Sequence, residues 1–376
     1  MSDEAVSGMG ESRAVDAGEK SRPVKHRAQA LDLMRAFAAM AVLTYHVWLY
    51  RLPNPNRPTR DGWFDFSVFE LRVGLIVFFV MSGYLLYRPL LAHWQASPRT
   101  VSLRRYYWRR IVRIVPAYYL AILGSILMLW GLEGTPGVRL PPAEDLWLFI
   151  FFLQNYSRET LLTLDAPTWT LAVQAAFYLV FPLFLVLGSR LGRRAWLVPA
   201  ALVVLGAVFN WVSFKNGWGP IARLSLPAMI PYLALGMLIA HLPPLKTRRA
   251  AVWMILGGAV LAIGNSLWHA TGVGDWSLGV LRDTPGAIGY ALIIAACAQP
   301  VIGASARLRW AESFGRWSYG VFLWHLPLLL FAKGHGLMPS SAFLTWVLLV
   351  AASAAVGAAT WRFVERPMLA RSRGSD

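Results

Sequence analysis

Long apolar stretches separated by short polar segments dominate the chain from about residue 28 onward. A helix needs about 20 apolar residues to cross the hydrocarbon core of a bilayer. About ten stretches approach that length: 31–50, 73–91, 114–130, 168–187, 195–214, 224–242, 250–268, 284–302, 317–332 and 343–364. The pattern predicts an all-α polytopic membrane protein with about ten transmembrane helices.

The segments outside these stretches differ from one another in character. Stretch 145–153 is apolar but too short to cross, so we expect a non-spanning interfacial or re-entrant helix there. Residues 1–27 are small, polar and charged, which predicts a disordered cytoplasmic tail rather than a cleaved signal peptide. Residues 28–370 then form a single transmembrane domain, and residues 371–376 form a second cytoplasmic tail.

Composition agrees with a membrane protein, since 57% of the residues are apolar and the mean hydropathy is +0.48. The net charge of +17 does not indicate nucleic-acid binding, because the basic residues lie in short clusters between apolar stretches. Cys297 is the single cysteine, which excludes a disulfide or a cysteine-based metal site within the chain. The excess of Arg over Lys, with abundant Ala, Leu and Val, is typical of a GC-rich bacterial genome.

The basic residues also predict orientation, because cytoplasmic loops are enriched in Lys and Arg. Alternate loops are rich in these residues, whereas the loops between them hold few. Both termini are then cytoplasmic, provided that 145–153 does not cross. The rich loops contain Arg22, Lys25, Arg27, Arg99, Arg104, Arg105, Arg109, Arg110, Arg113, Arg190, Arg193, Arg194, Lys246, Arg248, Arg249, Arg307, Arg309, Arg366, Arg371 and Arg373.

Ionisable residues inside a membrane are costly and indicate function. The first stretch carries Arg35 and His46. Eleven residues separate them, which puts them on one helical face about 16 Å apart. In the structural alternative, Arg35 extends its side chain to the membrane surface and His46 is a hydrogen-bonded core residue. Their shared face favours a functional pair.

Two further segments allow both a structural and a functional interpretation. Ser82 and Gly83 form a small surface that suits either close helix packing or a cavity wall. The densest basic segment, 104–113, suits either the cytoplasmic side with its anionic lipids or a phosphorylated cofactor. We predict that the cofactor-binding residues are Arg35, Ser82, Arg105, Arg109, Arg110 and Arg113.

Polar residues in the fourth and ninth stretches complete the candidate site. Gln174 and His325 lie in the outer halves of their stretches, at a depth similar to that of His46. We predict His46 and Gln174 as the catalytic residues, and no metal site, since no carboxylate or thiol accompanies the histidines. The predicted substrate-binding residues are Trp169, Tyr178, Tyr319 and His325.

In this order, six segments resemble the acyltransferase-3 family of bacterial membrane O-acyltransferases. They are 31–35 with His46 (an Arg-x10-His pattern), 78–84, 109–116, 169–182, 318–327 and 365–367. The resemblance runs from about residue 28 to residue 370. It implies transfer of an acyl group, usually acetyl, from a cytoplasmic acyl-CoA to a hydroxyl, typically on a sugar.

The resemblance also implies roles for individual residues. His46 matches the general base, while Arg35 and the Arg109/Arg113 cluster match donor-binding residues. The expected partners are membrane lipids, acetyl-CoA or another acyl-CoA, and a hydroxyl-bearing acceptor such as a macrolide antibiotic, a glycolipid or a cell-envelope glycan; we favour a small amphiphilic glycoside. The expected location is the bacterial cytoplasmic (inner) membrane.

One departure from the family pattern leaves alternatives open. The family usually has Glu where this chain has Gln174, and a carboxylate there would orient the histidine. The alternatives are a natural variant and a deliberate Glu-to-Gln change that traps substrate. A catalytically silent protein is therefore one other hypothesis. A transporter or flippase is a second, although no repeated halves are visible.

Overall fold

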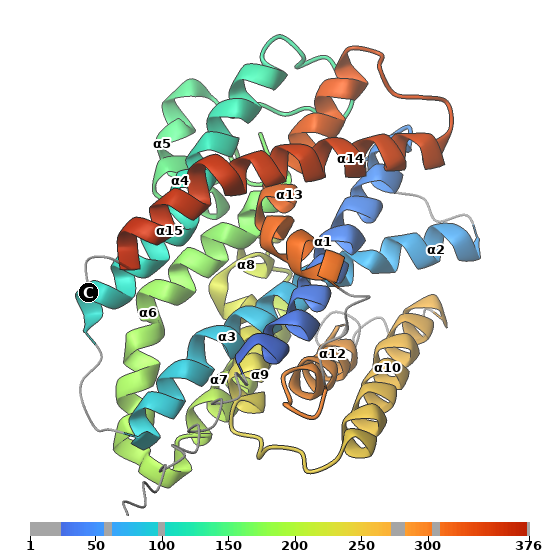
Figure 1. Ribbon diagram of the computed structural model, residues 1–376. Helices are drawn as coiled ribbons and strands as arrows, with labels where there is room; N and C mark the ends of the chain where they lie inside the picture. Colours follow the sequence, from blue (N-terminus) through green and yellow to red (C-terminus); the bar gives the residue numbers. More distant parts are fainter. Residues whose placement is uncertain (1–23, 56–61, 97–101, 272–282, 303–308, 374–376) are drawn as a thin grey trace, which may run out of the picture.

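The computed structural model describes residues 24–55, 62–96, 102–271, 283–302 and 309–373, and these residues form helices and loops without a strand. Figure 1 shows them as a bundle of long helices (Figure 1). The longer elements are α1 (Val24–Arg51), α2 (Trp63–Glu70), α3 (Gly74–Ala96), α4 (Leu103–Leu129), α6 (Trp169–Leu191), α7 (Leu197–Lys215), α9 (Leu226–Ile239), α10 (Arg248–Thr271), α12 (Thr284–Cys297), α13 (Arg309–Gly334), α14 (Ala342–Thr360) and α15 (Arg366–Arg373).

Seven helices in the described part of the chain are long and apolar enough to cross a membrane, so the expected count of about ten is not confirmed. They begin at Gln29, Leu103, Ala166, Leu197, Pro220, Arg248 and Ala342. The other predicted spans fall on α3, α12 and α13. With 14 residues, α12 is only about 21 Å long. α13 is long but carries polar residues of the candidate site.

Segment 145–153 forms short turns instead of a spanning helix. It contains the end of η2 (Ala143–Asp145) and the five-residue α5 (Leu146–Ile150). A helix of five residues is about 7.5 Å long, far less than the bilayer core. The loop that follows returns to η4 (Ala166–Thr168) and α6.

Helix α4 begins well before the predicted span 114–130. The basic segment 104–113 is its first part, because the Ser102 hydroxyl accepts a hydrogen bond from the Arg105 N–H and caps the helix. Charges at that end do not interrupt a helix, since arginine is a good helix former and extends beyond the apolar core. The cationic and apolar parts of α4 therefore belong to one continuous helix, with Pro116 at their junction.

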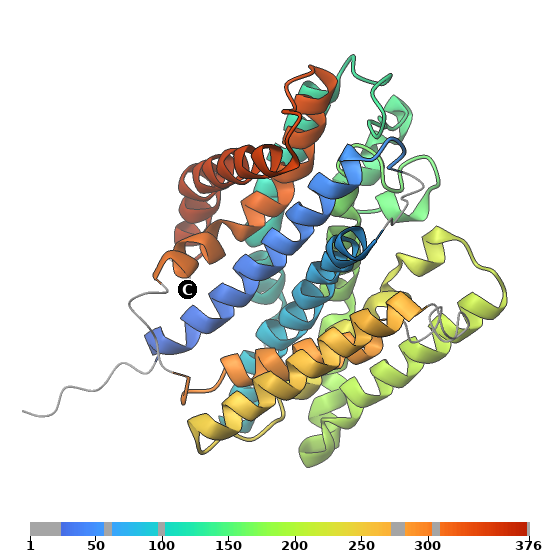
Figure 2. The same cartoon turned by 90° about the vertical axis from the view of Figure 1, so that its right-hand side faces the viewer.

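At the centre of the bundle, α1 packs along α13 on one side and α3 on the other (Figures 1 and 2). On its far side, α3 lies against α9. A Cβ added at Gly83 would lie 1.9 Å from the Leu233 carbonyl oxygen, and one at Gly236 would lie 1.9 Å from the Val80 carbonyl oxygen. The two backbones thus touch through glycines, as in tightly packed membrane helices.

Candidate active site

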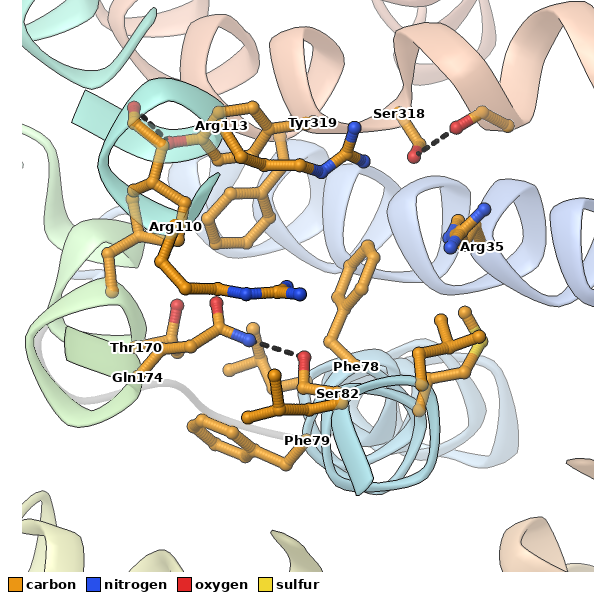
Figure 3. Close-up of a pocket in the computed structure, with 18 of the residues that line it drawn as sticks. Arg35, Phe78, Phe79, Ser82, Arg110, Arg113, Thr170, Gln174, Ser318 and Tyr319 are labelled. Atoms are coloured by element: carbon orange, nitrogen blue, oxygen red, sulfur yellow. Dashed lines mark hydrogen bonds between the residues drawn. The ribbon is translucent and has the colours of Figure 1, made fainter. Parts of the chain in front are cut away.

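A cavity of about 520 Å³ lies among α1, α3, α4, α6 and α13. This volume is typical of a small-molecule site. Its apolar wall includes Phe78, Phe79 and Met81 from α3, and its polar wall includes Thr170, Gln174 and Tyr178 from α6. Figure 3 shows the side chains of several helices converging on this space (Figure 3).

Arginine is the main charged residue of the cavity. Arg35, Arg110, Arg113 and Arg316 line it, and Asp32 is the acidic residue beside them among the lining residues that the structure describes. Asp32 accepts a hydrogen bond from the Arg35 guanidinium. The lining thus carries a net charge of +3, from four arginines and one aspartate. A partly enclosed cavity of this charge attracts anions, and guanidinium groups bind phosphates through paired hydrogen bonds.

One face of α4 supplies two of these arginines. Tyr106, Arg110, Arg113 and Ala117 follow the helical period, and Tyr106 and Ala117 are buried. Arg110 lies over the Tyr178 ring, 5.7 Å from its centroid. Of the four arginines predicted on α4, Arg110 and Arg113 line the cavity, whereas Arg105 and Arg109 are exposed and lie outside its lining.

Ser82 and Gln174 meet inside the cavity. The Gln174 amide donates a hydrogen bond to the Ser82 hydroxyl, joining α6 to α3 (Figure 3). Both interpretations of the Ser82–Gly83 pair hold, since Ser82 lines the cavity while Gly83 packs against α9. Gln174 and His46, which the sequence places at a similar depth, do not contact each other among the described contacts, and the Gln174 amide is turned toward Ser82.

His46 pairs with His325 instead. The Nε2 atom of His325 lies 3.0 Å from Nδ1 of His46, and the ring centroids are 5.0 Å apart. Both rings are buried, with 7% and 1% of their surface exposed. The α1–α13 contact therefore joins two imidazoles that the sequence placed only at a similar depth.

Two phenylalanine rings lie between the histidine pair and the cavity. Phe322 and Phe78 line the cavity, and their ring centroids are 5.6 Å apart in an edge-to-face contact. The Phe322 ring also lies 5.9 Å from the His325 ring. His46 and His325 are absent from the described lining, so the aromatic pair marks its boundary on that side.

The other predicted residues divide between the cavity and its surroundings. Tyr178 and Tyr319 line the cavity, and Tyr319 donates a hydrogen bond to the Ile114 carbonyl. Trp169 lies outside the lining, where its ring packs against Phe79 at 6.0 Å between centroids. Arg316 also lines the cavity but was not predicted, because it lies two residues before the segment 318–327.

Asp165, in the loop before α6, is a buried carboxyl group that lies outside the cavity lining. Its carboxylate oxygens have no hydrogen-bond partner in the described structure, and its backbone carbonyl accepts bonds from the Thr168 N–H and hydroxyl at 3.0 and 2.6 Å. Burial raises the pKa of Asp165 well above its ordinary value of 3.8. The neighbouring Ala166 packs against the core cluster that contains Val47 and Tyr50.

Comparison with known proteins assigns the family. The acyltransferase-domain model matches residues 29–362, which is most of the chain. The chain belongs to the acyltransferase-3 family. Membership and the seven apolar helices together make it a multi-pass membrane protein.

Several acyltransferase-3 relatives carry names that specify an activity. A Bacillus subtilis protein, provisionally named peptidoglycan O-acetyltransferase YrhL, is 27% identical over 90% of this chain and 54% of its own length. Peptidoglycan O-acetyltransferase OatA of Listeria monocytogenes is 25% identical over 90% of this chain and 55% of its own length. O-acetyltransferase OatA of Staphylococcus aureus is 25% identical over 90% of this chain and 56% of its own length. The chain spans about half the length of these relatives, and no solved structure matches it.

Proposed function

We propose that this chain is a membrane-embedded O-acyltransferase that moves an acyl group, first of all acetyl, from acyl-CoA to a hydroxyl of a glycosidic acceptor. Family membership supports acyl transfer. The four-arginine cavity supports an anionic donor, because CoA carries phosphates at one end and a thioester at the other. Arg35, Arg110, Arg113 and Arg316 would hold the phosphates by charge-assisted hydrogen bonds.

His46 is the proposed general base. It lies eleven residues beyond Arg35 on α1, or about 16 Å along the axis, so one helix offers a cation for the phosphates and an imidazole for the reacting end. The imidazole takes the acceptor hydroxyl proton as the oxygen attacks the thioester carbonyl. The C–S bond then breaks, the thiolate takes that proton from the imidazolium, and the products are an ester and free CoA.

A cell-envelope glycan is the acceptor that we propose first, because the names of two relatives specify peptidoglycan. Glycolipids and macrolide antibiotics are the other glycosidic acceptors to test. No feature described above supports the transporter hypothesis. Catalytic silence, suggested by Gln174, is one outcome of the experiment below.

Ten spans in a bacterial inner membrane, with both termini cytoplasmic, form the proposed topology. It places the arginine end of α4 at the cytoplasmic face, where acyl-CoA is made. Labelling tests this topology with single cysteines at Glu133 and Arg158, which are both exposed, in a Cys297→Ala background. Both should react from the outer side, whereas labelling from opposite sides would show that 145–153 lies within a span.

The activity test uses the purified chain in detergent with radiolabelled acetyl-CoA and three acceptors: a chitooligosaccharide, a glycolipid and a macrolide. Labelled ester and free CoA should appear in equal amounts with at least one acceptor. His46→Ala is the matched inactive variant. Acetyl-CoA binding without turnover on any acceptor would indicate a silent homologue, and no binding at all would remove the proposed donor.

A further inference from the structure

We propose that His325 is the positioning residue of the acyltransferase base: its Nε2 accepts a hydrogen bond from the Nδ1–H of His46, which leaves His46 Nε2 unprotonated and able to take the hydroxyl proton. This inference rests on the proposed function. It assigns to His325 a part in the reaction different from the substrate contact expected from the sequence.

The hydrogen-bond partners determine the tautomer of each ring. The Nδ1 atom of His325 lies 2.7 Å from the Phe322 carbonyl and 3.3 Å from the Val321 carbonyl. Carbonyl oxygens only accept hydrogen bonds, so this Nδ1 carries the proton. The Nε2 atom of the neutral His325 ring then has a lone pair directed at His46.

The partners of the His46 ring determine its tautomer in the same way. Its Nδ1 atom lies 2.9 Å from the Val42 carbonyl and 3.0 Å from His325 Nε2. Both neighbours are acceptors, so this Nδ1 is a shared donor. In the neutral ring, Nε2 is therefore the unprotonated nitrogen, which is the form that a general base requires.

His325 also stabilises the cation that forms. When His46 Nε2 takes the hydroxyl proton, the Nδ1–H bond to His325 strengthens, because its donor is now charged. If that proton moves across, the charge passes to His325, whose Nδ1–H already faces the Phe322 carbonyl. The proton returns by the same path when the CoA thiolate leaves, so the pair ends the cycle unchanged. The arrangement parallels the orienting carboxylate of a serine-hydrolase triad, with a neutral acceptor in its place.

The test compares two amides of different reach at position 325. In His325→Gln, the side-chain oxygen reaches about as far as imidazole Nε2 and can accept a hydrogen bond from the His46 Nδ1–H. In His325→Asn, the oxygen reaches only about as far as Nδ1, so it leaves His46 without this acceptor. His241→Gln is the matched control, since His241 is bonded to the Tyr87 hydroxyl at 3.1 Å, away from the cavity.

We expect kcat for acetyl transfer to fall about 10²-fold in His325→Asn and less than about tenfold in His325→Gln. The KM for acetyl-CoA and its calorimetric Kd should stay at parental values in both variants. The control should keep parental kcat. A merely structural histidine would not produce this split, because both amides remove the ring.

Two results would overturn the inference. One is parental kcat in the folded His325→Asn variant, and the other is equal loss in the Gln and Asn variants with CoA binding intact. The proposed function has a separate test, since near-parental transfer by His46→Ala would remove the base itself, whatever happens at position 325. Should His325→Asn fail to fold, His325→Leu takes its place as the variant without an acceptor, and parental kcat in a folded His325→Leu protein would overturn the inference in the same way.

Discussion

The arginine cavity and the histidine pair lie next to each other but are built for opposite tasks. The cavity is about 520 Å³ in volume and carries a net charge of +3 on its lining. The histidine pair is almost fully buried and partnered by backbone carbonyls. Phe78 and Phe322 lie between the two regions. Strong cations suit the binding of a charged donor, while a dry neutral imidazole suits proton transfer, and the division keeps arginines away from the base.

The largest effect should come from removing the base. We expect His46→Ala to lower transfer about 10²- to 10⁴-fold, the usual contribution of a general base, while acetyl-CoA binding remains. Turnover with radiolabelled acetyl-CoA and calorimetric binding should be measured on the same preparation. If His46→Ala lost acetyl-CoA binding together with activity, donor binding and proton transfer would not be separate tasks of the two regions.

Removing arginines from the cavity should instead impair binding of acetyl-CoA. Arg110→Gln with Arg113→Gln should weaken acetyl-CoA binding, because each lost charge-assisted contact costs about 1.5 to 3 kcal/mol. The Kd should therefore rise by at least about tenfold per residue. The same double change at Arg193 and Arg194, outside the cavity, provides the charge-matched control. Equal losses in both variants would point to a general charge effect on the donor.

The pH dependence of stability tests whether the Asp165 carboxyl group, which lies outside both regions, is shielded from water. Because burial raises the pKa of Asp165, the folded protein holds this proton more tightly than the unfolded chain. The resulting stabilisation is complete below about pH 4 and is lost as the pH rises toward the folded-state pKa, by up to about 1.4 kcal/mol per pH unit. Asp165→Asn should therefore melt at a higher temperature than the parent at pH 7 and at a similar temperature near pH 4. Parallel melting curves across this range would show an ordinary, hydrated carboxyl group.

The smallest effect should follow Gln174→Glu. The sequence suggested that a carboxylate here would assist His46, but the side chain contacts Ser82 inside the cavity. A second negative charge among the arginines should raise the KM for acetyl-CoA by up to about tenfold, equal to 1.4 kcal/mol, with a smaller change in kcat. A rise in kcat at constant KM would instead support an action on the base.

The sequence predicted the long apolar helices and singled out several residues that line the cavity, because membrane spans and intramembrane charges leave strong patterns. It did not tell which arginines of α4 face the cavity, since the rotation of this helix depends on the burial of Tyr106 and Ala117. It missed the contact between His46 and His325, which are 279 residues apart, because similar depth does not determine which helices touch. The orientation of the Gln174 amide likewise depends on Ser82, 92 residues away.

The glycine contact between α3 and α9 has a consequence for motion. Gly83 and Gly236 let the two backbones pack directly against each other, with no room for even a methyl group between them. A carrier that opens alternately to two sides needs relative movement of the helices around its site. The seam instead favours α3 and α9 keeping one relative position, so the proposed donor would bind beside a cavity wall of fixed shape that carries Ser82.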